Sequence, residues 1–487
     1  MKLIRDILYK VAIKSVLGST DREVSTIEFD SRKVQQNNVF VAIKGNADDG
    51  HHYIEKAIKK GAIAIVHEDD FKTKHQGVTY IQVDNSAKAL ALMASNYFNH
   101  PSHNLNLIGI TGTNGKTTVA SLLYDLFKAA GYKVGLISTV KILVHEQFYT
   151  ATHTTPDSLS INHYLKLMND AGVEFCFMEV SSHGIDQFRT EGLLFKGGIF
   201  TNLSHDHLDY HKTFAAYRDV KKSFFDQLPK TAFALINQDD KNGQIMVQNS
   251  KAKIYTYSLK NYSNYRVKIL ENQFKGLFLK INDSDIWTRL IGAFNAYNLA
   301  AIFGCTDILG MESNEVLRLM SNLESVSGRF QFFVTDSNIT VIIDYAHTPD
   351  ALKNILLTIN EIRTKNETLI TVFGCGGDRD KSKRSKMGHI ASALSDKVIF
   401  TSDNPRSENP DAIISEIERG VEAQNYNKII SITKRDQAIK TACQLANSSD
   451  IILVAGKGHE TYQEIDGDKT HFNDFEVTQN YLKQLQK

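Results

Sequence analysis

Residues 105–118 read LNLIGITGTNGKTT, an apolar run followed by a loop of glycine and hydroxyl side chains. After this loop, apolar residues recur at the spacing of one helix face, at Val119, Leu122, Leu123, Leu126, Phe127 and Ala130. Gly131 marks where such a helix would end. The stretch therefore predicts a strand, a loop and a helix, with the N–H groups of the loop and the helix N-terminus facing an anion.

The residues of this loop are those of a nucleoside-triphosphate site. Lys116 would reach the outer phosphates, and the Thr117 hydroxyl would reach Mg²⁺. The strict pattern G-x₄-G-K-[ST] is broken, because Ile110 stands where the first glycine would be and Gly112 lies inside the loop instead. We favour a phosphate loop over a chance glycine-rich turn, since strand, loop, lysine, hydroxyl and amphipathic helix all agree.

Length and composition set the scale of the molecule. At 487 residues, the chain should form about three domains of roughly 150 residues each. Hydrophobic residues make up 42% and charged residues 23%, which is typical of a globular protein and argues against long disordered segments. The 56 basic and 55 acidic side chains give a net charge of +1, so no global field attracts nucleic acid or a membrane. We therefore expect neither partner.

The N-terminal residues and the cysteines indicate a cytoplasmic protein. Charges at Lys2, Arg5 and Asp6 fall where a signal peptide needs an apolar core, and no apolar run approaches the roughly 18 residues of a membrane span. We expect a cytoplasmic monomer. We also expect no disulfides, because the cysteines are scattered, and they lack the paired spacing of a zinc site. They are Cys176, Cys305, Cys375 and Cys443.

The alternation of strands and helices restarts twice along the chain. It breaks around Asn99–Ser102 and again at Ser327–Arg329. We therefore expect an α/β protein of three domains. They are an N-terminal α/β domain at residues 1–100, a central domain with a parallel sheet at residues 101–330 and a C-terminal Rossmann-like domain at residues 331–487.

The C-terminal region has the most regular alternation, and polar clusters follow four of its apolar runs. Because open α/β sheets bind ligands beyond the carboxyl ends of their strands, four such loops would line one crevice. Turns and helix caps alone are the alternative explanation for these residue types. The clusters are Asp344–His347, Gly374–Asp380, Asp403–Arg406 and Gly456–Glu460.

Two further motifs in the central region suggest metal binding. Glu179 ends an apolar strand and is a suitable Mg²⁺ ligand, since this hard cation prefers carboxylate oxygen and phosphate. The segment Ser204–His211 holds three histidines in seven residues, at 205, 207 and 211. Zinc is the weaker reading, because no cysteine and no H-E-x-x-H helix is nearby. A neutral imidazole of this cluster could instead complete a Mg²⁺ shell.

In order along the chain, these motifs resemble those of the Mur ligase family, cytoplasmic enzymes that add amino acids to a UDP-N-acetylmuramoyl peptide. The resemblance covers essentially the whole chain and implies a UDP-binding N-terminal domain, a central ATPase domain of P-loop type and a C-terminal amino-acid-binding domain. Each motif is short, but their order and completeness are specific. They are Thr111–Thr117, Glu179–Gly184, Asn202–His211, Gly292–Asn298, Gly328–Phe330 and Asp344–His347.

The resemblance assigns roles to individual residues. It implies that catalysis depends on Lys116, Glu179, His207 and Lys221, and that Mg²⁺ is held by Thr117, Glu179, His207 and Lys221. The residues that it implies for ATP are Gly112, Thr113, Asn114, Gly115, Lys116, Thr117, Thr118, Asn295, Arg329, Asp344 and His347.

The stretch Tyr217–Lys221 resembles the segment that carries a carbamylated lysine in the family, which implies a CO₂-derived carbamate on Lys221. The family usually has alanine where Val220 stands, and Lys222 adjoins the candidate, so the choice of Lys221 rests on its spacing from Tyr217. Chemistry alone would favour a solvated helix cation.

Within the family, the resemblance is strongest to the members that add the third residue of the peptide. It implies UDP-MurNAc-L-Ala-D-Glu as a substrate, bound by Ser31, Thr154, Thr155, Ser181, Gln187 and Arg189. It also implies that the added amino acid contacts Arg379, Asp403, Asn404, Pro405, Arg406, Gly456 and Glu460.

The tetrad Asp403–Arg406 accompanies meso-diaminopimelate in the family, whereas lysine-adding relatives usually lack the arginine. The physics agrees, because meso-diaminopimelate has one distal carboxylate more than lysine, and a guanidinium can bind it through two charge-assisted hydrogen bonds. The alternative is that Asn404-Pro405 makes a turn and Arg406 is a solvated cation beside Glu408.

The implied reaction is an ATP-dependent amide ligation. Because a carboxylate is a poor acyl donor, the γ-phosphoryl group of ATP is first transferred to it, and an amine then attacks the acyl phosphate. Folylpolyglutamate synthases are the nearest enzymatic rival, but they give no reason for Asp30-Ser31-Arg32 or for the Asp403–Arg406 tetrad. A nucleotide-driven switch or motor is the other alternative, and it would need neither a carboxylate nor an amine substrate.

Overall fold

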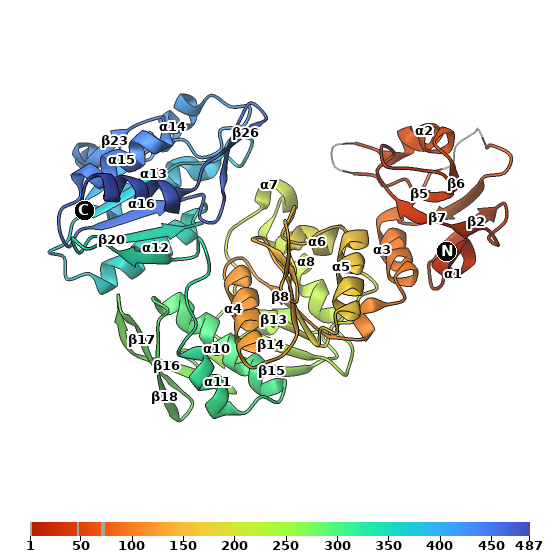
Figure 1. The fold of residues 1–487 in the computed structure, drawn as a ribbon, viewed down its shortest axis with the longest axis horizontal. Coiled ribbons are helices and arrows are strands. Elements are labelled where there is room, and N and C mark those ends of the chain that lie inside the picture. The colour runs from red at the N-terminus through yellow and green to blue at the C-terminus, as the bar shows by residue number, and fades with distance from the viewer. Residues whose placement is uncertain (1, 46–47, 70–73) are drawn as a thin grey trace.

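The computed structural model describes residues 2–45, 48–69 and 74–487. Its three large sheets follow one another along the chain, and each is covered by helices. The central part lies between the N-terminal and the C-terminal parts (Figure 1). An α/β architecture of three domains is thus confirmed, and the exact boundaries at residues 100 and 330 stay predictions.

The N-terminal sheet has the strand order β2-β7-β6-β5-β4. Strands β4 to β7 are parallel, and β2 pairs with β7 in the antiparallel direction. Helix α2 (Ile54–Lys59) covers one face, and α1 (Ile4–Ile7) and α3 (Ser86–Tyr97) cover the other. The strands are Ile13–Leu17 (β2), Thr26–Glu28 (β4), Asn38–Val41 (β5), Ala62–His67 (β6) and Thr79–Val83 (β7).

The central sheet has eleven strands, in the order β11-β10-β9-β12-β8-β13-β14-β15-β16-β17-β18. The strands from β9 to β16 in this order are mutually parallel. They are Asn106–Thr111 (β8), Val134–Ile137 (β9), Phe175–Glu179 (β12), Gly197–Phe200 (β13), Phe233–Asn237 (β14), Lys253–Ser258 (β15) and Tyr265–Gln273 (β16).

The central sheet has the predicted parallel core, and antiparallel strands extend it at both edges. A hairpin of β10 (Ile142–Val144) and β11 (Gln147–Tyr149) extends one edge, and β17 (Gly276–Ile281) and β18 (Ser284–Thr288) extend the other. Tight turns permit these antiparallel connections, because His145 and Asn282 adopt left-handed conformations with φ of 53° and 48°. The short hairpin strands gave no separate signal in the sequence.

Helices cover both faces of the central sheet. One face packs against α4 (Lys116–Ala129), α10 (Ala293–Ile308) and α11 (Ser313–Met320). The other packs against α5 (Ser158–Asp170), α8 (Phe214–Asp226) and α9 (Gly243–Met246). The short helices α6 (Ser182–Asp186) and α7 (Leu208–His211) follow β12 and β13, at the edge where the phosphate loop also lies.

The C-terminal sheet has the order β19-β20-β24-β21-β22-β23, and only β19 is antiparallel to its neighbour. Helices α12 (Pro349–Ile362), α13 (Ser382–Leu394) and α14 (Pro410–Glu418) cover one face, while α15 (Arg435–Leu445) and α16 (Asp474–Gln484) cover the other. The strands are Gln331–Val334 (β19), Thr340–Asp344 (β20), Leu369–Phe373 (β21), Lys397–Phe400 (β22), Ile429–Ser431 (β23) and Ile451–Ala455 (β24).

This strand order determines which loops become neighbours. Strand β24 is the last of the six in sequence, yet it lies between β20 and β21. The loops after β20, β24, β21 and β22 therefore follow one another along the carboxyl edge of the sheet. A hairpin of β25 (Tyr462–Ile465) and β26 (Asp468–His471) continues the loop after β24.

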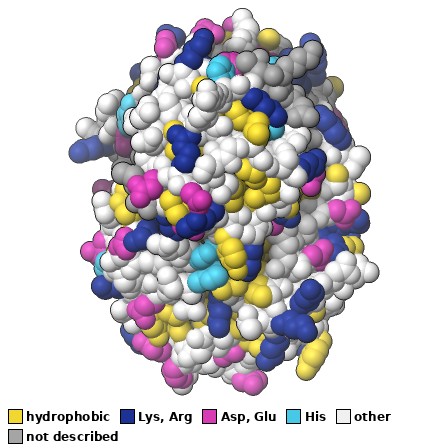
Figure 2. All heavy atoms as spheres, turned by 90° about the vertical axis from the view of Figure 1, so that its right-hand side faces the viewer, with side chains coloured by type: hydrophobic (Ala, Val, Ile, Leu, Met, Phe, Trp, Pro, Cys, Tyr) yellow, Lys and Arg dark blue, Asp and Glu magenta, His cyan; other side chains and the backbone are white. Residues whose placement is uncertain are grey.

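Three features of the sequence can be checked directly. All four cysteines are buried and none forms a disulfide, as expected. Within the described part of the chain, every helix is too short or too polar to span a membrane. On the face turned toward the viewer in Figure 2, basic and acidic side chains are interspersed, so neither sign of charge dominates that face.

One buried ion pair joins the two helices beneath the C-terminal sheet. Arg435 and Asp474 are both fully buried, and the two side chains form a bidentate pair at 2.6 and 2.8 Å. The guanidinium of Arg435 also donates to the carbonyl of Ser402 at 3.4 Å and to that of Ala455 at 3.0 Å. The pair therefore fixes the ends of β22 and β24, from which two of the polar loops start.

We predict that Arg435→Met lowers the free energy of unfolding of the C-terminal domain by about 3 kcal/mol or more, because it leaves a buried carboxylate without a partner. Arg289→Met is the matched control, since Arg289 pairs with Glu324 on the surface and should contribute under about 1 kcal/mol. Urea denaturation followed by circular dichroism measures both. Equal losses in the two variants would contradict the prediction. Trp287, the only tryptophan, lies in β18 and reports separately on the central domain.

Candidate active site

The phosphate loop connects β8 to α4 as the sequence predicts. Gly112 must be glycine here, because its φ is +150° and a Cβ atom would lie 1.9 Å from the Thr201 hydroxyl oxygen. The segment after β13 holds the loop through two hydrogen bonds to Asn202. The Thr113 N–H donates to the Asn202 carbonyl at 2.8 Å, and the Asn114 N–H donates to the Asn202 side chain at 3.0 Å.

Two lysines meet at one carbonyl of this loop. Lys116 Nζ and Lys221 Nζ each donate to the Gly112 carbonyl oxygen at 2.9 Å, and Lys116 also donates to the Thr113 carbonyl at 2.8 Å. Burial lowers the pKa of both ammonium groups, that of Lys221 strongly, and the Lys116 cation lowers the pKa of Lys221 further. Lys221 is not the solvated helix cation that chemistry alone favoured, because only 1% of it is exposed.

The predicted metal residues Thr117 and Glu179 are adjacent. The Thr117 hydroxyl donates to Glu179 Oε2 at 3.0 Å, and the Thr139 N–H donates to Glu179 Oε1 at 2.7 Å. Arg329 lies just before the predicted boundary at residue 330 but packs with the C-terminal part, since the adjacent Phe330 belongs to the core of that part, and it donates to the same Thr117 hydroxyl at 3.1 Å. Its guanidinium also lies 4.6 Å from the centre of the Tyr345 ring. A hydroxyl, a carboxylate and an arginine of two domains therefore converge at the start of α4.

His207 lies at the start of α7 with a φ of 54°, and its ring is 3.4 Å from the Asp206 carboxylate and edge-on to His183. Burial lowers its pKa to about 4, so the imidazole is neutral near pH 7 and can act as a ligand. The zinc alternative gains no support. In the described ranges, the histidines at 205–211 and nearby acids do not bring three ligand atoms within 4.8 Å of one another.

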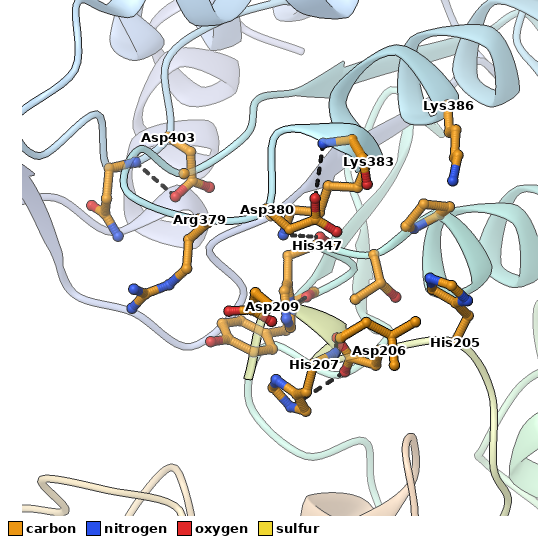
Figure 3. A pocket seen from close by; sticks show the side chains of 18 of the residues that line it. His205, Asp206, His207, Asp209, His347, Arg379, Asp380, Lys383, Lys386 and Asp403 are labelled. Atoms are coloured by element: carbon orange, nitrogen blue, oxygen red, sulfur yellow. Dashed lines mark hydrogen bonds and ion pairs between the residues drawn. The ribbon is translucent and has the colours of Figure 1, made fainter. Parts of the chain in front are cut away.

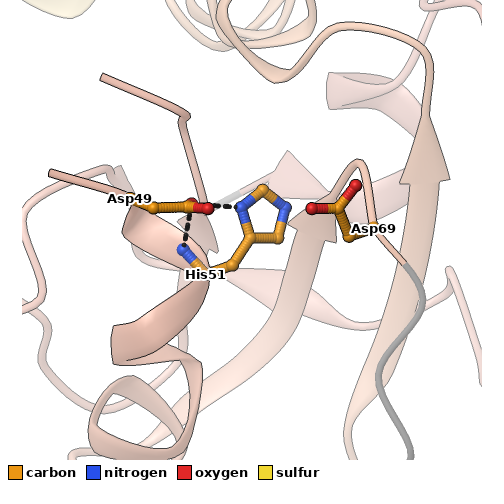
Figure 4. Close-up of side chains that lie close together, drawn as sticks. All are labelled: Asp49, His51 and Asp69. Carbon is orange, nitrogen blue, oxygen red and sulfur yellow. Dashed lines mark hydrogen bonds and ion pairs between the residues drawn. The ribbon is translucent and has the colours of Figure 1, made fainter. Parts of the chain in front are cut away.

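Among the described residues, one trio brings three possible metal-ligand atoms within 4.8 Å of one another. It consists of Asp49, His51 and Asp69, in the N-terminal part (Figure 4). Both ring nitrogens of His51 are already engaged. Nδ1 contacts Asp49 at 2.6 Å, and Nε2 accepts the Glu68 N–H at 2.9 Å. Asp69 pairs with Lys44. The trio is therefore a hydrogen-bonded connection between two loops and has no ring lone pair left for a metal.

A first cavity of about 490 Å³ lies between the central and C-terminal parts, above the phosphate loop. It brings together seven of the residues predicted for ATP. They are Asn114, Gly115, Thr118, Asn295, Arg329, Asp344 and His347. Asn295 is placed by its side chain, which donates to the Ile291 carbonyl at 2.8 Å and accepts from Asn298 at 3.0 Å. Asp344 accepts the Phe330 N–H at 2.6 Å, and burial raises the pKa of its carboxyl.

A second cavity, of about 420 Å³, lies beside the first and is shown in Figure 3. His183 and residues 205–209 line it from the central part. From the C-terminal part, the four polar loops predicted to share a crevice all contribute to its wall. Six of the seven residues predicted for the amino acid are among these, namely Arg379, Asp403, Asn404, Arg406, Gly456 and Glu460. Pro405, the seventh, is buried between them.

Arg406 is not the solvated cation beside Glu408 that the alternative reading described. It is half-buried, donates through Nη1 to the Gly377 carbonyl at 2.8 Å and lies 3.6 Å from Glu464 through Nε. Glu408 instead pairs with Arg384 at 2.9 Å and with Lys381 at 3.1 Å. Within the described residues, Nη2 of Arg406 has no hydrogen-bond partner, which leaves one face of the guanidinium for an anion.

Five of the six residues predicted for the UDP-linked substrate form one cluster in the central part. Thr155 Oγ1 accepts the Ser181 N–H at 2.9 Å, and Arg189 donates to the Gln187 amide oxygen at 2.6 Å. Thr154 contacts Thr139 at 3.0 Å. Ser31 lies in the N-terminal domain after β4 and, in the described chain, makes no hydrogen bond to the other five. That domain adjoins the cluster, because Leu159 of α5 packs against its core.

Several residues of the site were not predicted as site residues, although two of them, Tyr297 and Lys457, lie inside segments that the sequence singled out. Tyr297 and Tyr257 line the first cavity, where Tyr297 donates to Asp239 at 2.9 Å and Tyr257 donates to the Phe200 carbonyl at 3.0 Å. Lys383 lines the second and donates to the His347 carbonyl at 2.9 Å. Lys457 is fully buried between Asn404 and Glu460. An isolated lysine or tyrosine looks the same in a sequence whether it is solvated or part of a cavity.

Comparison with known proteins gives one consistent result. Three family models match the chain. They are the Mur ligase family catalytic domain at residues 23–98, the Mur ligase middle domain at residues 110–306 and the Mur ligase glutamate ligase domain at residues 328–458.

Relatives match over nearly the full length. A protein of Cytophaga hutchinsonii named UDP-N-acetylmuramoyl-L-alanyl-D-glutamate–2,6-diaminopimelate ligase is 50% identical over 99% of this chain and 100% of its own length. A protein of the same name from Clostridium tetani is 41% identical over 100% of both chains. A solved structure of a ligase of this name is 29% identical and superposes with a TM-score of 0.69, covering 100% of this chain and 99% of that one.

More distant structures share the fold alone. The MurF ligase of Thermotoga maritima, solved in complex with ADP, is 18% identical with a TM-score of 0.63 over 94% of this chain and 97% of its own. A folylpolyglutamate synthase of the same organism is 14% identical with a TM-score of 0.59 and matches only 76% of this chain. The rival enzyme class therefore shares the architecture, at a much lower similarity than the diaminopimelate ligases.

Proposed function

The chain belongs to the Mur ligase family, and from that premise we propose that it is the ATP-dependent ligase that joins meso-2,6-diaminopimelate to the D-glutamate of UDP-MurNAc-L-Ala-D-Glu. The reaction forms an amide through an acyl phosphate and yields a UDP-MurNAc-tripeptide. We place it in the cytoplasmic synthesis of peptidoglycan precursors, as the family implies. A monomer suffices for this activity, because both cavities are built from one chain.

The observation that carries the proposal is the second cavity. On one side it holds His207. Three residues earlier, the Ser204 N–H donates to the hydroxyl of Thr113 in the phosphate loop at 3.0 Å. On the other side, the cavity holds Arg406 and Glu460, which match the charges of a diaminopimelate molecule. A cavity at the phosphate loop and a cavity suited to a zwitterionic amino acid therefore lie side by side, with Tyr345 and His347 in the walls of both, as ligation requires.

The residues of the phosphate loop would stabilise charge on ATP. Lys116 is already directed at the loop, and its ammonium group would neutralise the charge that develops on the transferred phosphoryl group. Arg329 reaches the start of α4 from the C-terminal domain, so it would contact the nucleotide from the opposite side. Because two domains contribute cations, phosphoryl transfer should depend on how the domains are oriented.

The donors around Thr117 fit Mg²⁺. A hydroxyl and a carboxylate 3.0 Å apart are hard oxygen donors, and the neutral imidazole of His207 could complete a second position. When bound, the ion would supply positive charge to the phosphate oxygens. Glu179 is held ready by the Thr139 N–H and by the hydroxyl of Thr117, so its oxygens need little reorganisation to bind a cation.

The surroundings of Lys221 support a carbamate on this residue. A carbamate forms on a neutral amine, and burial together with the nearby Lys116 cation lowers the pKa of this ammonium well below its usual value, although Asp206 acts in the opposite direction. The neighbouring Lys222 differs, because its ammonium group is paired with the Asp226 carboxylate at 2.7 Å. A carbamate on Lys221 would place an anion between Lys116, His207 and the Gly112 carbonyl, where the structure otherwise gathers two cations.

The amino-acid end of the site accounts for the choice of substrate. Arg406 and Arg379 would bind carboxylates, and Glu460 would bind an ammonium group. Lysine lacks the distal carboxylate, so its binding would leave Nη2 of Arg406 without an anionic partner in a half-buried position. The structure therefore supports diaminopimelate over lysine on the same physical ground as the sequence.

The direct test of the proposal is the substrate dependence of phosphate release. With ATP, Mg²⁺ and UDP-MurNAc-L-Ala-D-Glu, the enzyme should release phosphate at a sustained rate only when meso-diaminopimelate is present. Omitting either the carboxylate or the amine substrate should abolish sustained turnover. Release with neither substrate would instead indicate a nucleotide-driven switch and would refute the ligase assignment.

We predict that Lys221→Ala is nearly inactive and regains part of its activity with added short carboxylates, because the missing group is an anion. Lys222→Ala is the matched control and should retain near-normal activity, since its side chain pairs with Asp226 of the same helix and not with the Gly112 carbonyl. Intact-mass measurement of the active enzyme checks the modification. An unmodified amine in fully active enzyme would count decisively against a carbamate.

We predict that Arg406→Ala loses most activity with meso-diaminopimelate and that its selectivity over L-lysine collapses, from a discrimination on the order of 10³-fold in the unmutated enzyme. Arg419→Ala removes a guanidinium from the surface of the same domain and should change neither rate. Steady-state ligation of the two amino acids measures the ratio. A preference of the unmutated enzyme for lysine would refute the assignment of meso-diaminopimelate as the substrate but not the assignment of ligase activity.

A further inference from the structure

Lys457 is a buried cation inside the amino-acid site that the proposed mechanism does not use. It lies in the loop after β24, and none of its side chain is exposed. Its ammonium group donates to Asn404 Oδ1 at 2.9 Å and to Glu460 Oε2 at 3.0 Å, and it lies 5.5 Å from the centre of the Tyr462 ring. A buried charge is costly unless it is paired, so these contacts hold the side chain in one place.

The loop around Lys457 is tightly packed, which prevents the lysine from turning outward. Gly456 and Gly458 have φ of +116° and +52°. A Cβ atom on Gly456 would lie 2.6 Å from Asp403 Oδ2, and one on Gly458 would lie 2.7 Å from the Gly328 carbonyl oxygen. The backbone on both sides of Lys457 is therefore confined by neighbouring loops.

Lys457 determines how the Asn404 amide is oriented. Asn404 Oδ1 faces two groups that can only donate, the Lys457 ammonium at 2.9 Å and the Glu464 N–H at 3.0 Å. The amide oxygen must face both of them, so Nδ2 must face Glu460, to which it donates at 2.8 Å. Without Lys457, the Glu464 N–H and the Glu460 carboxylate would still oppose a flip of the amide, but the charged donor to Oδ1 would be lost.

Lys457 also fixes the carboxylate of Glu460. Glu460 Oε2 accepts from both Lys457 and Asn404, whereas Oε1 has no hydrogen-bond partner within the described residues. Glu460 lines the second cavity, so Oε1 is the oxygen available to an ammonium group of the amino acid. Burial and the nearby Asp403 raise the pKa of Glu460, and Lys457 opposes both effects.

From this geometry we infer that Lys457 is a positioning residue that holds the Asn404 amide and Glu460 Oε2 in place, presents Glu460 Oε1 to the amino group of the incoming amino acid, and so sets the affinity for that substrate. The inference rests on the proposed function. It assigns Lys457 no contact with ATP, because the phosphate loop and the first cavity are built from other residues.

The test uses Lys457→Met in the full-length enzyme. With ATP and UDP-MurNAc-L-Ala-D-Glu saturating, the KM for meso-diaminopimelate should rise about ten-fold or more, since two hydrogen bonds to a charged group are lost. The KM for ATP should stay within about two-fold. Lys469→Met is the matched control, because this exposed lysine lies over the same Tyr462 ring at 4.6 Å without contacting Asn404 or Glu460.

The pH profile separates positioning from simple support of the fold. The charged and titratable groups that face Glu460 are Asp403 after β22, Lys457 in its own loop, Arg435 of α15, Tyr345 after β20 and Tyr462 of β25. Removing the Lys457 cation raises the pKa of Glu460 further, so the acid limb of kcat/KM for meso-diaminopimelate should move to higher pH. Lys457→Gln keeps a donor without the charge, so it should recover part of the KM and keep the shifted limb.

Each outcome supports or overturns the inference. An unchanged KM for meso-diaminopimelate and an unshifted acid limb in Lys457→Met would overturn it, and so would an equal rise in the KM of ATP. If Lys457→Met is too unstable for kinetics, Lys457→Gln provides the same comparison. Failure of the proposed function and failure of this inference give different results. An unmutated enzyme that is inactive with meso-diaminopimelate refutes the proposed function. An active unmutated enzyme whose Lys457 variants have unchanged kinetics refutes this inference alone.

Discussion

The Gly112 carbonyl oxygen accepts hydrogen bonds from two buried ammonium groups, Lys116 and Lys221, each at 2.9 Å. Two like charges at one oxygen are unfavourable in a dry site, and burial lowers the pKa of both. The arrangement persists because β8, α4 and α8 deliver the three residues to one point. An anion would offset the repulsion between these two groups, so the packing of the central domain favours a phosphate group at this point.

Local patterns in the sequence predicted the parts of the fold that depend on neighbouring residues. The phosphate loop from Gly112 to Thr118 was predicted because strand, glycines, lysine and helix are contiguous. The polar loops of the C-terminal sheet were predicted because each follows an apolar strand. The hairpins at the edges of the central sheet were missed, since β10 and β11 have only three residues each and show no alternation that separates them from loops.

Contacts between distant segments were beyond the reach of such patterns. Arg329 lies more than 200 positions from Thr117 along the chain, and only the packing of two domains brings the two side chains to 3.1 Å. Lys457 stands next to predicted residues, yet its burial follows from the insertion of β24 between β20 and β21. The resemblance identified most lining residues of the amino-acid cavity, whereas the side chains that hold them in place emerged only from the structure.

The bond between Arg329 and the Thr117 hydroxyl has a thermodynamic consequence. This guanidinium comes from the start of the C-terminal domain and occupies the neighbourhood where hydroxyl and carboxylate oxygens would receive a divalent cation. Two cations repel at short range, so the arrival of one shifts the equilibrium position of the other. Interdomain orientation and the affinity for a metal–nucleotide complex would therefore be linked. The factor by which binding shifts the equilibrium between domain orientations equals the factor by which that orientation changes the affinity.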